Sequence, residues 1–307
     1  MPVAPQSVVA PPAKTPPVHS LLSSANIVTE MDDRWEGGLS FFPENCGESS
    51  CWAPCPPRVN CVPTVMKDDC PPCDLEQIDY QPFVVYSTYV CSSFSAGPDF
   101  DFYARKARGL LLATEAKTVE SEFWNGTCVP TNPHLSEPVT VVDPLTGAVD
   151  ILTGDPYGAP SPAQTPGIGI AQLVNFLSQC NGGSRGMIHA VPMLVQRWAH
   201  CGAIHEVVEN GRRRFETAVG GHIIVPGSGY DGTGPGGVAP PAGQAYVYAT
   251  GMVDIRMGEI KIQQRNMEEA LNRRDNSVTV RAERTFAAVH DGCCFGALLV
   301  DTCGPMD

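Results

Sequence analysis

The 307-residue chain has few basic residues and lacks any long apolar run. Lys and Arg number 20 against 33 Asp and Glu, which gives a formal net charge of −13. This balance argues against a surface that grips nucleic acid, because phosphate binding needs many positive side chains. No apolar stretch approaches the roughly 18 residues of a membrane helix. We therefore expect neither a nucleic-acid-binding surface nor a membrane protein.

The beginning of the chain also lacks the pattern of an export signal. Residues 1–24, "MPVAPQSVVAPPAKTPPVHSLLSS", have no basic start and no apolar centre, and a signal peptide needs both. We expect a protein of a reducing compartment whose 13 cysteines are mostly free thiols. The richness of residues 1 to about 30 in Pro, Ala, Ser and Val predicts an extended arm that does not fold alone.

Cysteine and proline gather in one stretch, "NCGESSCWAPCPPRVNCVPTVMKDDCPPC", residues 45–73. The spacings Cys51-x3-Cys55 and Cys70-x2-Cys73 resemble the two halves of a four-thiolate zinc site. The surrounding prolines oppose this interpretation, because they remove the backbone amides that zinc knuckles place around their thiolates. Zinc binding, disulfides formed at assembly or after release, and free thiols packed as small apolar residues all stay open. Two further cysteines could serve as spare ligands, namely Cys46 and Cys61.

The segments on either side of this stretch predict its setting. Residues 34–42 and 80–91 are rich in aromatic and β-branched residues, which predicts the two strands of one projecting hairpin or loop. A long helix is predicted over residues 99–125, with Asp99 as its N-cap and Gly126 just past its end. Its apolar residues fall on two nearly opposite faces, so we expect a spine covered on different sides along its length. These faces are Tyr103, Ala107, Leu110, Leu111 and Thr114, and Leu112, Ala116, Val119 and Phe123.

The rest of the chain mixes short helices and strands without a βαβ rhythm or a repeat. Proline at the first turn predicts helices that begin near Pro166 and Pro192. A capping-box pattern predicts a short helix from Asn266 to about Arg274. A hairpin is expected over 138–154, and strands at 186–192, 215–227, 244–262, 277–292 and 293–301, the last of them buried.

One glycine pattern could indicate a cofactor. "GSGYDG", residues 227–232, matches the G-x-G-x-x-G fingerprint of dinucleotide-binding proteins. That fingerprint must open a helix whose amides receive the pyrophosphate, and the following "TGPGGVAPPAG" cannot be helical. We therefore expect a mobile loop here and no cofactor site.

No side-chain cluster predicts catalysis. His200, Cys201 and His205 lie close together, but the surrounding sequence offers no third, orienting group and no oxyanion site. Adjacent residues point to opposite faces of a strand, so Cys293 and Cys294 cannot chelate one ion together. We predict structural roles for both sets, no catalytic residues, and a protein that is not an enzyme.

The order of arm, long loop, spine helix and mixed compact region resembles one known family. It is similar to the major capsid proteins of tailed bacteriophages with the Hong Kong 97-like fold, which encapsulins share. Three stretches resemble actinobacterial phage capsid subunits: "ARKARGLLLATEAKTVESEFWNG", "YVYATGMVDIRMG" and "RAERTFAAVHDGCCFGALLV". The fold that this resemblance implies is α+β, with an N-arm at 1–33, an E-loop and flanking strands at 34–91, a P-domain with the spine helix at 92–159, an A-domain at 160–260, and a return to P-domain strands at 261–307.

The same resemblance implies a function. The chain would be a capsid subunit that assembles in the host cytoplasm into hexamers and pentamers of an icosahedral head enclosing double-stranded DNA. Portal, scaffolding and decoration proteins would be its partners, and the cysteine-rich stretch would reach over a neighbouring subunit. One alternative is an encapsulin-like compartment shell. Another is a cysteine-rich binding or enzyme domain stabilised by zinc on Cys51, Cys55, Cys70 and Cys73.

Overall fold

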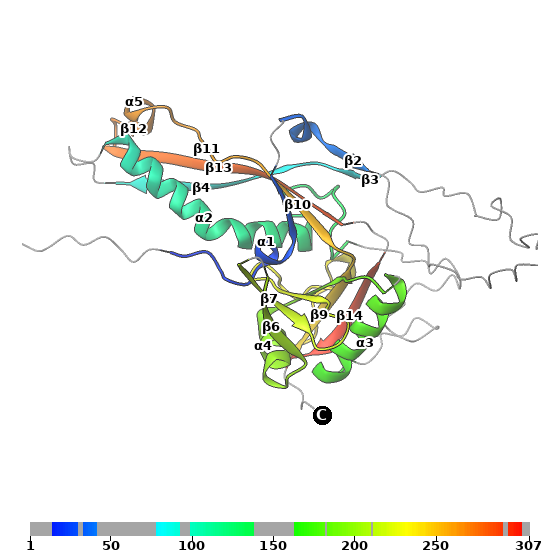
Figure 1. Ribbon diagram of the computed structural model, residues 1–307. Coiled ribbons are helices and arrows are strands. Elements are labelled where there is room, and N and C mark those ends of the chain that lie inside the picture. Colours follow the sequence, from blue (N-terminus) through cyan, green and yellow to red (C-terminus); the bar gives the residue numbers. More distant parts are fainter. Residues whose placement is uncertain are drawn as a thin grey trace, which may run out of the picture.

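The computed structural model describes residues 14–29, 33–41, 78–92, 99–137, 163–181, 183–209, 211–290 and 294–302. Within these ranges, two six-stranded sheets and a two-stranded ribbon are combined with helices, which confirms the α+β class. Figure 1 shows the long helix α2 beside the central sheet, and the second sheet below it with helices α3 and α4. Among the described residues, no helix is both long and apolar enough to cross a membrane.

The central sheet is organised around its longest strand, β13 (Ser277–His290). Along one side β13 pairs with β4 (Phe83–Cys91), and along the other with β10 (Val253–Met257), β11 (Lys261–Ile262) and β12 (Leu271–Asn272). The arm adds β1 (Asn26–Thr29), which pairs with β10 in parallel. One face of β13 is covered, because side chains alternate across a strand and five of them lie buried: Val278, Val280, Ala282, Phe286 and Ala288.

Helix α2 (Phe100–Asn125) is the predicted spine, with caps where the sequence placed them. The Asp99 side chain accepts the Phe102 amide at 3.0 Å, and Gly126 ends the helix at a left-handed φ of 59°. Coverage changes sides along the helix, as expected. Three residues differ from the predicted faces, because Leu110 and Thr114 are only half-buried and Leu112 is exposed. The buried residues include Tyr103, Ala107, Leu111, Ala116, Val119 and Phe123.

The second sheet has the strand order β14-β9-β5-β8-β7-β6. Its strands are β5 (Met187–Ala190), β6 (Ile204–Glu209), β7 (Arg212–Thr217), β8 (Ile223–Pro226), β9 (Gln244–Thr250) and β14 (Phe295–Asp301). Helices α3 (Pro166–Cys180) and α4 (Pro192–His200) begin at the predicted prolines. Their apolar faces and the sheet enclose a second core, which contains Leu173, Leu177, Leu194, Trp198, Val247 and Leu298.

At two adjacent places the chain passes directly from a strand of one sheet to a strand of the other. One crossing follows β9 and leads into β10, and the other follows β13 and leads into β14. The Gly251 amide of the first crossing donates to the Cys294 carbonyl of the second at 3.1 Å. Strand β14 was expected to be buried on both faces. It instead lies at the end of the strand order and alternates between buried and half-buried residues.

The predicted projecting hairpin is confirmed only at its base. Strand β2 (Leu39–Phe41) pairs antiparallel with β3 (Ile78–Tyr80), so the two ends of the intervening segment lie together. Residues 33–37 form a 3-10 turn, and β4 belongs to the central sheet. The cysteine-rich stretch and the predicted hairpin at 138–154 lie outside the described residues.

Two short helices also differ from the sequence analysis. The arm, predicted to be extended, contains α1 (Leu21–Ser24), which is held by a capping box between Ser20 and Ser23. Helix α5 (Met267–Ala270) begins after the predicted N-cap Asn266 but ends earlier than expected. It stops because the chain continues directly into β12, which pairs with β13.

Candidate functional site

Glu120 joins three segments that lie far apart in the sequence. It projects from the spine helix α2 and is fully buried. Its Oε1 accepts a hydrogen bond from the Leu21 amide of the arm at 3.0 Å. Its Oε2 accepts one from the Gly229 amide of the loop after β8, also at 3.0 Å. One carboxylate therefore fixes the arm and the second sheet to the spine. We call Glu120, Leu21 and Gly229 the junction.

The junction carboxyl has an unusual proton affinity. Burial raises the pKa of Glu120 to about 7, against the opposing effect of the backbone amides of Leu21, Gly229 and Ser228. Burial disfavours the charged form of a carboxyl, whereas donated hydrogen bonds favour it. At neutral pH the group is therefore close to half-ionised, and its charge is sensitive to small changes in pH.

The glycine-rich loop at 227–232 is packed against the spine helix, which contradicts the expected mobile loop. A side chain on Gly229 would overlap the Lys117 carbonyl oxygen and crowd the Ser121 amide. Tyr230 is buried and its ring centroid lies 4.6 Å from that of Trp124. Glycine is needed here for close approach to a helix backbone, and the pattern alone could not distinguish this need from a phosphate loop.

Polar contacts at the end of α2 extend the same attachment. The Trp124 indole donates to Thr233 Oγ1 at 3.0 Å, and Asn125 Nδ2 donates to Asp231 Oδ2 at 2.9 Å. Thr233 Oγ1 also lies 3.1 Å from Asn125 Oδ1. The loop is thus tied to the last two turns of the spine by both its backbone and its side chains.

A buried ion pair joins the middle of the spine to the central sheet. Arg284 Nη1 of β13 lies 3.0 Å from Glu115 Oε1 of α2. Burial raises the pKa of Glu115, and the Arg284 charge opposes that shift. Removal of either partner would leave a buried charge without compensation.

Strand β4 presents an exposed apolar row on the face away from α2. Its alternate residues Phe83 and Val85 are buried, whereas Val84, Tyr86 and Val90 are 47%, 56% and 57% exposed. The Arg281 guanidinium of β13 lies 3.6 Å from the centre of the Tyr86 ring. Among the described residues, β4 pairs only with β13, so its other edge is open. Long apolar edge strands tend to attract a further strand or chain.

Comparison with known proteins identifies the fold. No protein-family model and no curated protein sequence matches the chain. The chain is similar to the solved capsid of an empty GTA particle, at 13% identity and a TM-score of 0.51, over 97% of this chain and 95% of that one. The capsid of the native GTA particle matches at 13% identity and a TM-score of 0.50 over the same shares. The capsid of Ralstonia phage GP4 gives 11% identity and 0.49 over 99% and 97%.

The chain has the Hong Kong 97-like fold. The fold expected from the sequence is therefore confirmed. In this fold the spine helix α2 lies along the central sheet, and the junction connects it to both the arm and the second sheet (Figure 1).

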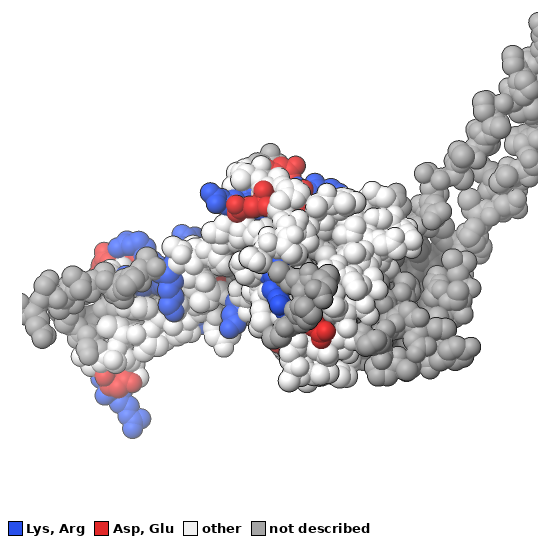
Figure 2. All heavy atoms as spheres, turned by 90° about the horizontal axis from the view of Figure 1, so that it is seen from below, with Lys and Arg blue, Asp and Glu red and all other residues white. Residues whose placement is uncertain are grey.

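Charge is distributed unevenly along this Hong Kong 97-like chain. The described residues carry 18 Lys and Arg against 20 Asp and Glu, and the remaining residues carry 2 against 13. Most of the net charge therefore lies outside the described residues. On the face in Figure 2, charged side chains are few and scattered. Helix α3 has no charged residue at all.

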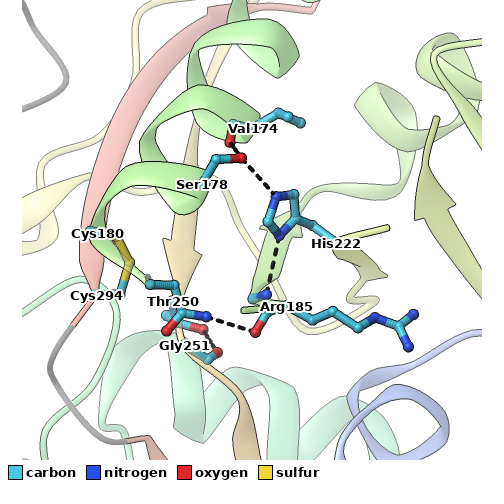
Figure 3. The surroundings of a disulfide bond; sticks show 10 residues. Val174, Ser178, Cys180, Arg185, His222, Thr250, Gly251 and Cys294 are labelled. Carbon is cyan, nitrogen blue, oxygen red and sulfur yellow. Dashed lines mark hydrogen bonds between the residues drawn. A yellow bond between two sulfur atoms is a disulfide. The ribbon is translucent and has the colours of Figure 1, made fainter. Parts of the chain in front are cut away.

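Ser178 and His222 approach each other beside α3, but they do not form a nucleophile and its base. His222 Nδ1 accepts the Gly186 amide at 3.1 Å, so in the neutral ring the proton is on Nε2, which faces Ser178 Oγ at 3.5 Å (Figure 3). Burial and the charge of Arg185 lower the pKa of His222. The Ser178 hydroxyl donates to the Val174 carbonyl at 2.8 Å. The ring thus has no lone pair to accept the serine proton.

The residues that the sequence offered as candidates for catalysis or metal binding do not form a site among the described residues. His200 ends α4, Cys201 follows it with its thiol 3.3 Å from the Trp198 carbonyl, and His205 is exposed on β6. No group of three or more metal-binding side chains occurs within the described ranges. The four proposed zinc ligands, Cys51, Cys55, Cys70 and Cys73, lie outside those ranges.

One pair is an exception to the expectation of mostly free thiols. Cys180, at the end of α3, and Cys294, just before β14, form a disulfide (Figure 3). Cys180 lies in no cysteine motif, and Cys294 stands out in the sequence only because Cys293 precedes it. The two are 114 residues apart, and no local pattern relates them.

Proposed function

We propose that this chain is a major capsid subunit, which self-assembles into hexamers and pentamers of an icosahedral phage head. The observation that carries the proposal is the likeness to the GTA particle capsid over 97% of the chain. A fold alone does not determine function, so the proposal also depends on surfaces suited to assembly. The role is structural rather than enzymatic.

The exposed row on β4 supports self-assembly. Among the described residues, one edge of the nine-residue strand β4 is unpaired and Val84, Tyr86 and Val90 are exposed, so a monomer would tend to aggregate. Contact with a neighbouring copy would remove both liabilities.

The parts of the chain then take the following roles. Residues 1–33 serve as the N-arm and 34–91 as the E-loop with its flanking strands. The P-domain comprises 92–159 and the returning strands of 261–307, and the A-domain comprises 160–260. Two strands depart from these bounds, because β10 belongs to the central sheet and β14 to the second sheet. The junction would keep the arm and the A-domain in a fixed relation to the spine while subunits associate.

The head would assemble in the host cytoplasm and enclose double-stranded DNA without reading its sequence. Portal, scaffolding and decoration proteins are the partners that such a head requires. None of these contacts involves a membrane.

Electron microscopy of the purified protein tests the proposal. We expect closed icosahedral shells, and DNA within those recovered from infected cells. Shells that enclose an enzyme instead of DNA would favour an encapsulin-like compartment. Small particles that contain stoichiometric zinc and never form shells would favour the zinc-stabilised domain and contradict the capsid proposal.

Purified subunits are expected to bind DNA poorly. A wall that encloses densely packed DNA must let it slide, and each Lys or Arg contact with phosphate would add a salt-dependent attachment. The net charge of −13 disfavours such contacts. A filter-binding assay at about 0.15 M salt should show little retention. Tight binding under these conditions would contradict an acidic inner wall.

The six cysteines at 45–73 are expected to stabilise particles rather than the subunit fold. Replacing all six by Ser should leave the unfolding temperature of the subunit unchanged, because both described cores consist of other residues. Particles should dissociate at a lower temperature or denaturant concentration, because docking between subunits is weakened. Metal analysis and thiol titration of intact particles would distinguish zinc, disulfides and free thiols. A variant that cannot fold would place these cysteines in a core.

A further inference from the structure

The disulfide lies where the chain passes between the two sheets. Cys180 is the last residue of α3, Cys294 directly precedes β14, and their Cα atoms are 5.6 Å apart. The Cys294 carbonyl accepts the Gly251 amide of the neighbouring crossing at 3.1 Å. Figure 3 shows the bridge beside Thr250 and Gly251. The bond therefore fastens the helix that covers the second sheet to both crossings.

The two sulfur atoms differ in access. Cys294 is 1% exposed and belongs to the second core. Cys180 is half-buried at the open end of its helix, next to a turn in which the Asn181 side chain donates to the Arg185 carbonyl at 2.7 Å. A small reagent can therefore reach the sulfur of Cys180 from solvent, whereas the sulfur of Cys294 is buried.

We propose that Cys180 and Cys294 form an oxidative modification site, which is reduced while subunits assemble and is closed by a low-molecular-weight disulfide after the particle leaves the cell. The timing rests on the proposed function, because a subunit that assembles in cytoplasm meets reducing conditions, and a released particle does not. The site itself rests on the adjacency of the two residues.

The closing reaction is thiol–disulfide exchange. The Cys180 thiolate attacks one sulfur of the reagent RSSR, forms a mixed disulfide and releases RS⁻, which takes up a proton. The Cys294 thiolate then attacks the Cys180 sulfur, which forms the bridge and releases the second RSH. Two thiols and one RSSR thus give one bridge and two RSH. Two electrons pass from the protein to the reagent.

Closure should make the subunit harder to unfold. The bridge encloses a segment of 114 residues, and loops of this length restrict the unfolded chain strongly. It should also slow opening of the crossings, because Gly251 and the first residue pair of β14, Phe295 with Thr250, lie next to it. These two consequences give separate readouts.

The experiment compares particles trapped with N-ethylmaleimide during cell lysis with the same particles after incubation in oxidised glutathione. Peptide mapping should find Cys180 and Cys294 alkylated in the first sample and bridged in the second. Oxidation should raise the unfolding temperature of purified subunits by about 5 °C or more. It should also slow amide hydrogen exchange at Gly251 and Phe295.

Matched variants isolate the pair. Cys180→Ser, at a half-buried position, should fold and lose the oxidation-dependent shift, and Cys294→Ala should lose it as well. Cys201→Ser removes an exposed free thiol just after α4 and should keep the oxidation-dependent shift.

Three outcomes would contradict the proposal in different ways. If both residues can still be alkylated after oxidation, or if Cys180 pairs with Cys293 or Cys303, the proposed site is wrong. A bridge already complete in trapped intracellular particles would overturn the timing. Purified subunits that close the bridge but never form shells would sink the proposed function and leave the site intact.

Discussion

Replacing Leu111 by Asp should unfold the subunit. Leu111 is 0% exposed and lies in the core between the spine helix and the central sheet. An unpaired carboxylate at that place costs several kcal/mol, or remains neutral at a similar cost. Domains are typically stable by only about 5–15 kcal/mol. Circular dichroism and urea unfolding of the purified variant should show lost helix and lost cooperativity.

The next residue provides the control. Leu112 is 36% exposed on the same helix, so Leu112→Asp makes the same chemical change while its carboxylate stays in water. We expect it to fold with a stability within about 1 kcal/mol of the wild type. A Leu111→Asp protein that unfolds at the wild-type urea concentration would show that α2 does not cover this core.

Local signals account for the elements that the sequence predicted well. Asp99 and Gly126 mark the ends of α2, and Pro166 and Pro192 begin α3 and α4. The alternation of Val278, Val280 and Ala282 identifies the buried face of β13 at its start. Each of these signals acts within a few residues, so it can be interpreted without knowledge of the partner.

The incorrect predictions concern residues whose pairing or burial depends on partners far away in the sequence. Strand β4 has the composition of a hairpin strand, but it pairs with residues 278–286, which follow it by almost two hundred positions. Leu110 and Leu112 were given covered faces by periodicity, although the sheet and the loop cover a different arc of the helix. The Cys180–Cys294 bridge has a similar origin, since its partners meet only through tertiary packing.

The junction was missed because a single glutamate in a helix usually faces water. One signal could have identified a buried carboxylate on this spine. Glu115 follows Leu111 by four residues, which places it on the covered face of the helix. Glu120 has the same signal, because it follows the buried Ala116 by four residues. Only its contacts with Leu21 and Gly229 reveal its role.

Replacing Glu120 by Ala should loosen the arm and the glycine loop together. The change leaves two buried amides, those of Leu21 and Gly229, without an acceptor. Each buried unsatisfied donor costs about 1–3 kcal/mol, so a total loss of about 2–6 kcal/mol is expected. Urea unfolding measures the loss, and hydrogen exchange at the two amides locates it. Glu120→Gln keeps one carbonyl oxygen and should protect one of the two amides. Unchanged exchange at both amides in the Ala variant would contradict the junction.

The loss in unfolding free energy caused by Glu120→Ala should also depend on pH, and its direction can be predicted. Burial raises the pKa of Glu120 to about 7, whereas an unfolded glutamate titrates near 4.3. Between these values the folded state binds more protons than the unfolded state, so the stability that Glu120 contributes is present below about pH 4 and falls as pH rises to about 7. Each pKa unit corresponds to about 1.4 kcal/mol, so the total fall is about 4 kcal/mol. Glu120→Ala lacks this titration, and the stability difference between wild type and variant should therefore be larger at pH 5 than at pH 8. An equal difference at both pH values would mean that the Glu120 pKa is not raised, and a larger difference at pH 8 would mean that the junction requires the ionised carboxylate.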